Sequence, residues 1–173
     1  LAGCVLAVSA QEAVPQKDRS QAFAGSFYPA RAAELKAALE GYYREASPLQ
    51  GSGRVQCLIV PHAGYDYSGR VAASAYKSIP ADTRYENIFI IASSHREQFD
   101  GFSIYPSGSY ITPLGSVKVN SEIAGSLIDS RKDITYIEKA HDREHSIEVQ
   151  IPYIQYHFKE VPPLVPIVMG SPS

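Results

Sequence analysis

Two histidines follow two apolar runs that the sequence predicts to be strands. His62 comes just after a predicted buried strand over residues 55–60, and His95 follows a second apolar run over residues 87–92. A helical pattern over residues 71–79 separates the runs, which is typical of a βαβ unit with a parallel sheet. The carboxyl ends of such strands meet at one sheet edge, where ligand sites usually lie. Because neutral imidazole is a common ligand of iron, copper and zinc, the pair is a candidate metal site.

Residues beside the two histidines are candidates for binding a ligand. Tyr65, Tyr67 and Ser68 follow His62, and Ser94 precedes His95. Their hydroxyl groups could supply polar contacts at the same edge of the sheet. The alternative is that each histidine is an ordinary surface loop residue, which is the more common situation for a single histidine.

A second cluster is the segment "KAHDREHSIE". Residues 141–145 spell H-x-x-E-H, the signature of inverted zincin peptidases, in which His141 and His145 would bind zinc and Glu144 would act as general base. That chemistry requires one helix through all five residues. Asp142 has the position of a helix N-cap, which would leave His141 outside the helix. A zinc peptidase is therefore the third and least favoured reading.

The composition is that of one globular domain. Of the 173 residues, 45% are hydrophobic and 20% are charged. The net charge of -2 offers no basic surface for nucleic acid, so we expect no nucleic-acid partner.

The first ten residues, "LAGCVLAVSA", resemble the end of a signal peptide cleaved near Ala10. We expect a signal-peptide remnant over residues 1–10, a polar linker over 11–22 and one domain over 23–173. The protein would then be exported to the periplasm or another extracytoplasmic space. Lipid attachment at Cys4 is a less favoured alternative, and a cytoplasmic location follows if the leader is not genuine. Ten residues cannot span a bilayer, so we expect no integral membrane segment in the mature chain.

Hydrophobic periodicity outlines the remaining elements. A helix is predicted over residues 32–46, and another over 121–129 with Asn120 or Ser121 as its cap. The runs "FSIYP" and "SVKVN" are predicted strands around a turn, "YITPLG". The segment "HSIEVQIPYIQYHF" fits both strand and helix spacing, and "LVPIVMG" begins another buried strand. Cys57 is predicted to be a small core residue. A strand followed at once by the end of the sequence suggests truncation, and we expect residues to be missing at both ends.

Five ordered motifs resemble those of a known family. They are "AGSFYP", "PHAGYDYSG", "SSH", "TPLG" and "EHSIEVQIPY", and they extend from Phe23 to the C-terminus. This series is similar to the Memo family, whose bacterial members are labelled AmmeMemoRadiSam system protein B. The resemblance implies an α/β fold, a three-layer sandwich with a mostly parallel central sheet, truncated here at the C-terminus. It is the fold of class III extradiol dioxygenases, and it favours a helix for "HSIEVQIPY".

The resemblance also implies a site. His62 and His95 would be metal ligands, and Asp142 and His145 would complete the polar wall as catalytic residues, with His145 as acid/base. The family's third ligand is a cysteine in the C-terminal part, which is absent from this sequence. Cys57 is not a substitute because it lies within the first predicted strand.

The implied function is a redox-metal pocket that holds iron or copper, with dioxygenase-like oxidoreductase activity. The alternative is a non-enzymatic module whose tyrosine-lined cleft binds a peptide or an aromatic small molecule. The sequence does not indicate the substrate, the choice of metal or the oligomeric state.

Overall fold

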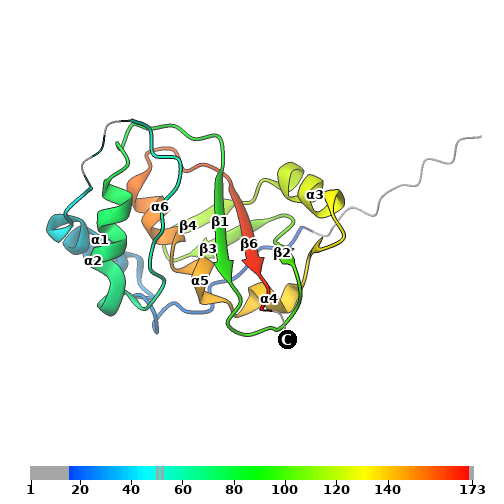
Figure 1. Ribbon diagram of the computed structural model, residues 1–173. Helices are drawn as coiled ribbons and strands as arrows, with labels where there is room; N and C mark the ends of the chain where they lie inside the picture. Colours follow the sequence, from blue (N-terminus) through cyan, green and yellow to red (C-terminus); the bar gives the residue numbers. More distant parts are fainter. Residues whose placement is uncertain (1–15, 50, 52, 172–173) are drawn as a thin grey trace, which may run out of the picture.

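The computed structural model describes residues 16–49, 51 and 53–171 (Figure 1). The predicted signal-peptide remnant and the alternative of lipid attachment at Cys4 lie outside the described residues. No helix within the described ranges is long and apolar enough to cross a membrane.

The central sheet has four strands in the order β1-β6-β2-β5. β1 (Ile88–Ser93) pairs in parallel with β6 (Leu164–Met169), and β2 (Phe102–Ile104) pairs in parallel with β5 (Ile134–Thr135). β2 is antiparallel to β6. The apolar runs predicted over 87–92 and from Leu164 therefore form the central parallel pair, and the expectation of a mostly parallel sheet is confirmed.

Six helices surround this sheet in the described part of the chain. They are α1 (Ala32–Glu45), α2 (Tyr65–Lys77), α3 (Ser121–Ser130), α4 (Glu138–Asp142), α5 (His145–Glu148) and α6 (Ile151–His157). Figure 1 shows α1, α2 and α6 grouped beside β1, whereas α3 lies at the opposite edge, beyond β2. The arrangement is a mixed α/β fold consistent with the predicted three-layer sandwich.

The segment "HSIEVQIPY" is helical, but it forms two helices. α5 ends at Glu148 and α6 begins at Ile151, with Pro152 in the first turn of α6. Proline has no backbone N–H and is favoured in a first turn, so its position fits the start of a new helix. Asn120 caps α3 through a hydrogen bond from the Ile123 amide, as predicted.

The predicted turn "YITPLG" is mostly strand. β3 (Ser109–Thr112) and β4 (Gly115–Lys118) form an antiparallel hairpin, and only Pro113 and Leu114 lie between them. Tyr110 is 1% exposed, so the burial of an aromatic strand residue overrides the turn signal of the nearby proline and glycine.

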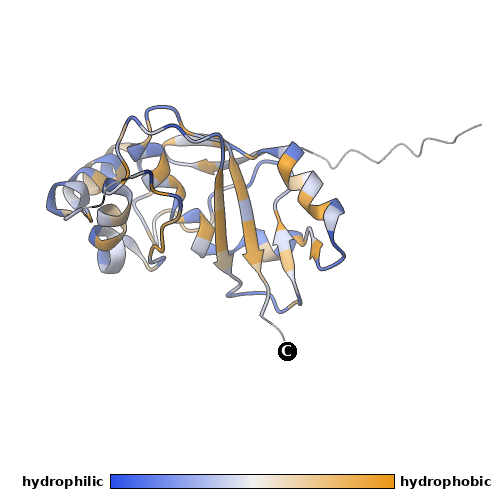
Figure 2. Cartoon of the chain, turned by 45° about the horizontal axis from the view of Figure 1, so that its top comes forward, coloured by the Kyte–Doolittle hydropathy of each residue, from blue (hydrophilic) through white to orange (hydrophobic). Residues whose placement is uncertain are grey.

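The predicted strand over residues 55–60 is wrong. This segment belongs to no helix or strand and pairs with no strand in the described chain, and Ile59 is 97% exposed. Cys57, predicted to lie in the core, is exposed as well. β1 pairs only with β6 and not with this segment, so the apolar residues have no neighbouring strand against which to pack. Figure 2 shows the hydrophobic character of β1 and β6.

The predicted polar linker over residues 11–22 does not hold at Arg19. Its side chain is 1% exposed and forms an ion pair with Glu148, which is fully buried. Glu148 also accepts hydrogen bonds from the Phe23 amide and the Tyr28 hydroxyl. A buried arginine requires such partners, so the folded domain begins before the predicted Phe23.

Candidate metal centre

Three of the five histidines meet at the carboxyl end of β1. His62 ends the extended segment, His95 follows β1, and His145 is the first residue of α5. One possible ligand atom from each lies within 4.8 Å of the other two. The Nε2 atoms of His62 and His95 are 3.4 Å apart. The sequence therefore placed His62 and His95 together correctly, although the segment before His62 is not a strand.

Contacts from several elements hold the segments that carry these rings. The Gln150 side chain donates a hydrogen bond to the Pro61 carbonyl, next to His62. The Ser146 hydroxyl lies 3.4 Å from the Ser93 carbonyl, which connects the start of α5 to the end of β1. These contacts join three parts of the chain that are far apart in sequence.

The loop "FAGSFYP", residues 23–29, forms a wall beside His145. The Phe27 ring centroid lies 4.6 Å from that of His145, and the Phe23 ring centroid lies 5.5 Å from it. These aromatic contacts restrict the imidazole ring and leave its side chain only 15% exposed. The loop thus helps to position a site residue as well as to fill the core.

Glu144 holds His95 in place. Its Oε2 atom accepts a hydrogen bond from the His95 amide at 2.7 Å, and its Oε1 atom lies 3.0 Å from His95 Nδ1. Oε1 also accepts from the Ser146 amide, so Glu144 is the N-cap of α5. The carboxylate favours a proton on Nδ1 of His95. The lone pair of His95 Nε2 is then directed toward His62, as in a carboxylate–histidine–metal arrangement.

The electrostatics of the cluster favour metal-ligating protonation states. Burial, together with the neighbouring His95, lowers the pKa of His62, although Glu144 opposes this shift. Burial also lowers the pKa of His145. For Glu144, burial alone would raise the pKa, but hydrogen bonds from Ser146 and His95 lower it below its ordinary value. His62 and His145 are thus neutral at pH 7, with lone pairs free for a cation.

The donor set fits a metal ion. Two nitrogens bound at about 2.0–2.1 Å to one tetrahedral ion lie about 3.4 Å apart, which matches the separation of the His62 and His95 Nε2 atoms. His145 Nδ1 is buried and has no hydrogen-bond partner among the described residues, even though Glu144 Oε1 is 3.4 Å away. An unpaired buried nitrogen is costly unless something binds it. Cys57 is not part of this group of ligand atoms.

The two tyrosines predicted to bind a ligand lie in different environments. Tyr65 is 2% exposed, and its hydroxyl donates a hydrogen bond to the Val149 carbonyl, which joins α2 to the end of α5. Tyr67 is 89% exposed and lines a surface hollow of about 880 Å³, together with His62 and His145. Only Tyr67 therefore presents its side chain to a ligand beside the cluster.

The remaining predicted site residues, Ser68, Ser94 and Asp142, form no hydrogen bond to the histidine rings in the described structure. The Ser68 hydroxyl donates to the Ala63 carbonyl. The Ser94 hydroxyl donates to the Glu97 carbonyl within its own loop. Asp142 is exposed at the end of α4, and it is not the predicted N-cap, because that role belongs to Glu144. The negative charge beside the cluster is thus that of Glu144.

The structure does not form the single helix that the H-x-x-E-H reading requires. α4 ends at Asp142, and α5 begins only at His145. His141 belongs to α4 and is 1% exposed, with its ring nitrogens 3.0 Å from the Ser103 hydroxyl and 3.2 Å from the Tyr110 hydroxyl. Both nitrogens already have partners, so His141 is a core residue.

Two functional features were missed by sequence reasoning. Glu144 was considered only as a peptidase base, although a carboxylate next to a candidate ligand is a recognisable signal for an orienting residue. The Arg19–Glu148 pair had no local signal, because its partners are 129 positions apart in the sequence.

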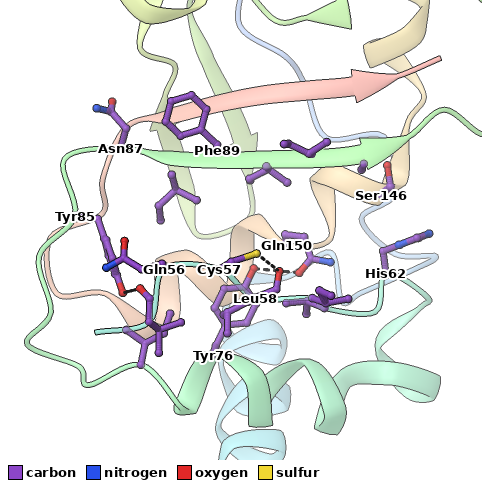
Figure 3. A pocket seen from close by; sticks show the side chains of 18 of the residues that line it. Gln56, Cys57, Leu58, His62, Tyr76, Tyr85, Asn87, Phe89, Ser146 and Gln150 are labelled. Carbon is purple, nitrogen blue, oxygen red and sulfur yellow. Dashed lines mark hydrogen bonds between the residues drawn. The ribbon is translucent and has the colours of Figure 1, made fainter. Parts of the chain in front are cut away.

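A separate cavity of about 630 Å³ lies between β1 and residues 55–60, with His62 at one end (Figure 3). Among the labelled side chains that line it, Tyr76 comes from α2, Ser146 from α5 and Gln150 from the turn between α5 and α6. This space, named here the β1 groove, is mainly apolar and is distinct from the hollow beside Tyr67.

Comparisons with known proteins identify the family. The model of the family described as "Memo-like protein" matches residues 19–173. A MEMO1 family protein from Thermoplasma volcanium is 38% identical over 153 residues, covering 88% of this chain and 56% of that relative. The relative from Pyrococcus abyssi is 37% identical, covering 88% of this chain and 53% of its own length. The chain thus spans little more than half the length of these relatives, and it belongs to the Memo-like protein family.

Proposed function

We propose that this protein binds a redox-active metal ion, iron or copper, through His62 and His95. The observation that carries the proposal is the 3.4 Å separation of their Nε2 atoms at the sheet edge, with Glu144 fixing the ring of His95. Imidazole ligands suit both metals. The family resemblance supplies a third ligand, a cysteine in the C-terminal part, which a full-length protein would contribute.

We further propose a dioxygenase-like oxidoreductase activity toward an aromatic diol. The metal, when bound, would supply the redox chemistry with oxygen. His145 lies beside the two ligands, and its lowered pKa leaves it neutral, so it can accept a proton from a substrate hydroxyl. Phe27 and Tyr67 border the adjoining hollow and provide an apolar, aromatic surface for a ring.

Metal content tests the first proposal. The protein is purified without oxygen, reconstituted with Fe²⁺ or Cu²⁺, and its metal is measured by elemental analysis. We expect about one ion per chain in the wild type and a loss of at least tenfold in affinity for His62→Ala and His95→Ala. His157→Gln is the matched control, because His157 lies on α6 outside the cluster and should leave binding unchanged. Equal metal content in the wild type and His62→Ala would refute the site.

Oxygen uptake tests the second proposal separately. Metal-loaded protein is mixed with catechols, and we expect substrate-dependent consumption of oxygen that disappears after chelation. Stable metal binding without any oxygen consumption would contradict the oxidoreductase proposal and leave the metal site intact.

A binding module is the second candidate, and the hollow beside Tyr67 favours it. Its lining includes Phe27, Val71 and Tyr67, of which the last two are 60% and 89% exposed. Exposed aromatic side chains are common in surfaces that bind other molecules. Calorimetry measures the affinity of the wild type and of Tyr67→Ala for aromatic compounds and short peptides. Affinity without turnover would distinguish a binding module from an enzyme.

A further inference from the structure

One edge of β1 has no strand partner. The amides of Ile88 and Ser94 donate to Pro163 and Met169, so the amides of even-numbered residues face β6. Backbone groups alternate in direction along a strand, and the N–H and C=O groups of Phe89, Ile91 and Ser93 therefore face away from β6. In the described chain no strand pairs with this second edge, because β6 is the one strand next to β1, and only its last carbonyl, that of Ser93, has a side-chain contact, with the Ser146 hydroxyl at 3.4 Å.

The opposite wall of the β1 groove is also unpaired. Residues 55–60 belong to no helix or strand, run alongside β1 (Figure 3), and make no backbone–backbone hydrogen bond within the part of the chain that the structure describes. Their polar contacts are few: the Tyr85 hydroxyl donates to the Val55 carbonyl, for example. The segment ends at His62 and β1 ends near His95, whose rings meet, so the two walls run in the same direction (Figure 3).

The space between the walls has the size of one strand. A six-residue strand is about 20 Å long, neighbouring strands of a sheet are spaced about 4.8 Å apart, and packed layers are spaced about 10 Å apart. One strand therefore occupies a volume of roughly 960 Å³. The β1 groove holds about 630 Å³, which is of the same order. Its floor is formed partly by Tyr76, Ile79 and Phe158, which offer an apolar surface to the side chains of such a strand.

We propose that the β1 groove accepts an additional β-strand, supplied by the part of a family-length polypeptide that lies outside these 173 residues. Two unpaired extended edges that face each other across an apolar space match a backbone ligand, because a strand would satisfy both rows of polar groups. The relatives indicate where such a strand would come from, because this chain covers 53–58% of their length. The family resemblance places the rest after this region. This inference does not depend on the metal.

Hydrogen exchange at single amides tests the proposal. The 173-residue chain is compared with a chimera that carries, after Ser173, the unmatched C-terminal part of the Thermoplasma volcanium relative. We expect the amides of Phe89 and Ile91 to exchange at least tenfold more slowly in the chimera, whereas that of Ile90, already facing β6, changes little. Unchanged exchange at Phe89 and Ile91 would overturn the proposal. Protection that appears in the 173-residue chain as its concentration rises would assign the groove to a second copy, and would also overturn it.

A proline variant provides a second test. Ile91→Pro removes an N–H that faces the groove and leaves the pairing with β6 intact, so it should shift the melting temperature of the chimera but not that of the 173-residue chain. Ile90→Pro is the control, because it removes an N–H that faces β6 and should destabilise both proteins. An equal effect of Ile91→Pro on both proteins would contradict strand addition.

The native thiol of Cys57 gives a readout if the chimera does not fold. Cys57 is exposed and lines the β1 groove. In a Cys4→Ser background, its labelling by a thiol reagent is followed while the separately produced C-terminal part is added. At least tenfold slower labelling supports occupation of the groove, and an unchanged rate refutes it.

Discussion

The carboxylate of Glu144 contacts His95 twice, through the backbone amide at 2.7 Å and through Nδ1 at 3.0 Å. The two contacts fix both the position of the residue and the orientation of its ring. Glu144 is only 2% exposed, so water does not compete strongly for the carboxylate. A buried charge held by hydrogen bonds in this way is suited to orient a metal ligand.

Glu144→Gln is therefore expected to weaken metal binding about 10–100-fold, as is typical when an outer partner of a histidine ligand is lost. The amide has no negative charge and does not fix the same His95 tautomer. The measurement is a metal titration by calorimetry, with circular dichroism to verify the fold.

Asp142→Asn is the matched control. Asp142 is two positions from Glu144 in the sequence, but its side chain is exposed. The structure shows no hydrogen bond from Asp142 to the histidine cluster. We expect its metal affinity to stay within about twofold of the wild type. A larger loss for Asp142→Asn than for Glu144→Gln would reverse the assignment of the orienting carboxylate.

His145→Ala distinguishes a proton-transfer role from a ligand role. If His145 serves as acid/base, the variant should retain its metal and lose turnover by about 10²–10⁴-fold. Metal content and oxygen uptake are measured on the same sample. Loss of the metal would instead make His145 a third ligand, an outcome that its unpaired Nδ1 atom also permits.

The features predicted correctly from the sequence are those that depend on local hydrophobic spacing or on segments that end at the same edge of the sheet. His62 and His95 meet as expected, because each follows an extended apolar segment that ends at the same place. The helix over residues 32–46 is found as Ala32–Glu45, since its apolar stripe has helical spacing and buries Leu35 and Leu39.

Failures arose where distant partners decide the structure. Residues 55–60 have the composition of a buried strand, but a strand also needs a neighbour, and β1 pairs elsewhere. Arg19 was placed in a linker because its own segment is polar, whereas its environment is set by Glu148. Asp142 was predicted as the cap because aspartate is a favoured N-cap residue, whereas the N-cap of α5, which packs against β1, is Glu144.

The Arg19–Glu148 pair connects the N-terminal segment to the loop that carries Glu144. Arg19 Nε donates to the His141 carbonyl at 3.1 Å, and Nη2 donates to the Glu144 carbonyl at 3.0 Å. Arg19→Ala leaves Glu148 as an unpaired buried charge, so we expect a loss of about 3–5 kcal/mol in the free energy of unfolding. Urea denaturation measures this loss.

The exposed Arg84–Glu160 pair is the control for charge alone. Both side chains are at least 75% exposed, and Arg84→Ala should change the free energy of unfolding by less than about 1 kcal/mol. Similar effects of the two substitutions would show that burial of the Arg19 pair contributes little.

His141 makes the fold sensitive to acid. Burial, and then the nearby charge of Arg19, lowers the pKa of His141 to about 3, whereas the ordinary value is 6.5. Between these values the unfolded chain binds a proton that the folded chain does not, so stability falls as the pH falls below 6.5. From pH 7 to pH 5 the loss from this residue is about 2 kcal/mol.

His141→Gln removes this titration while retaining a polar side chain near Ser103 and Tyr110. We expect the variant to be less stable than the wild type at pH 7, because its hydrogen bonds are imperfect. Its further loss between pH 7 and pH 5 should be smaller than that of the wild type by about 2 kcal/mol. Urea denaturation of both proteins at the two pH values gives the comparison. Equal losses would mean that another group, such as the half-buried His157 with its lowered pKa, dominates the acid response.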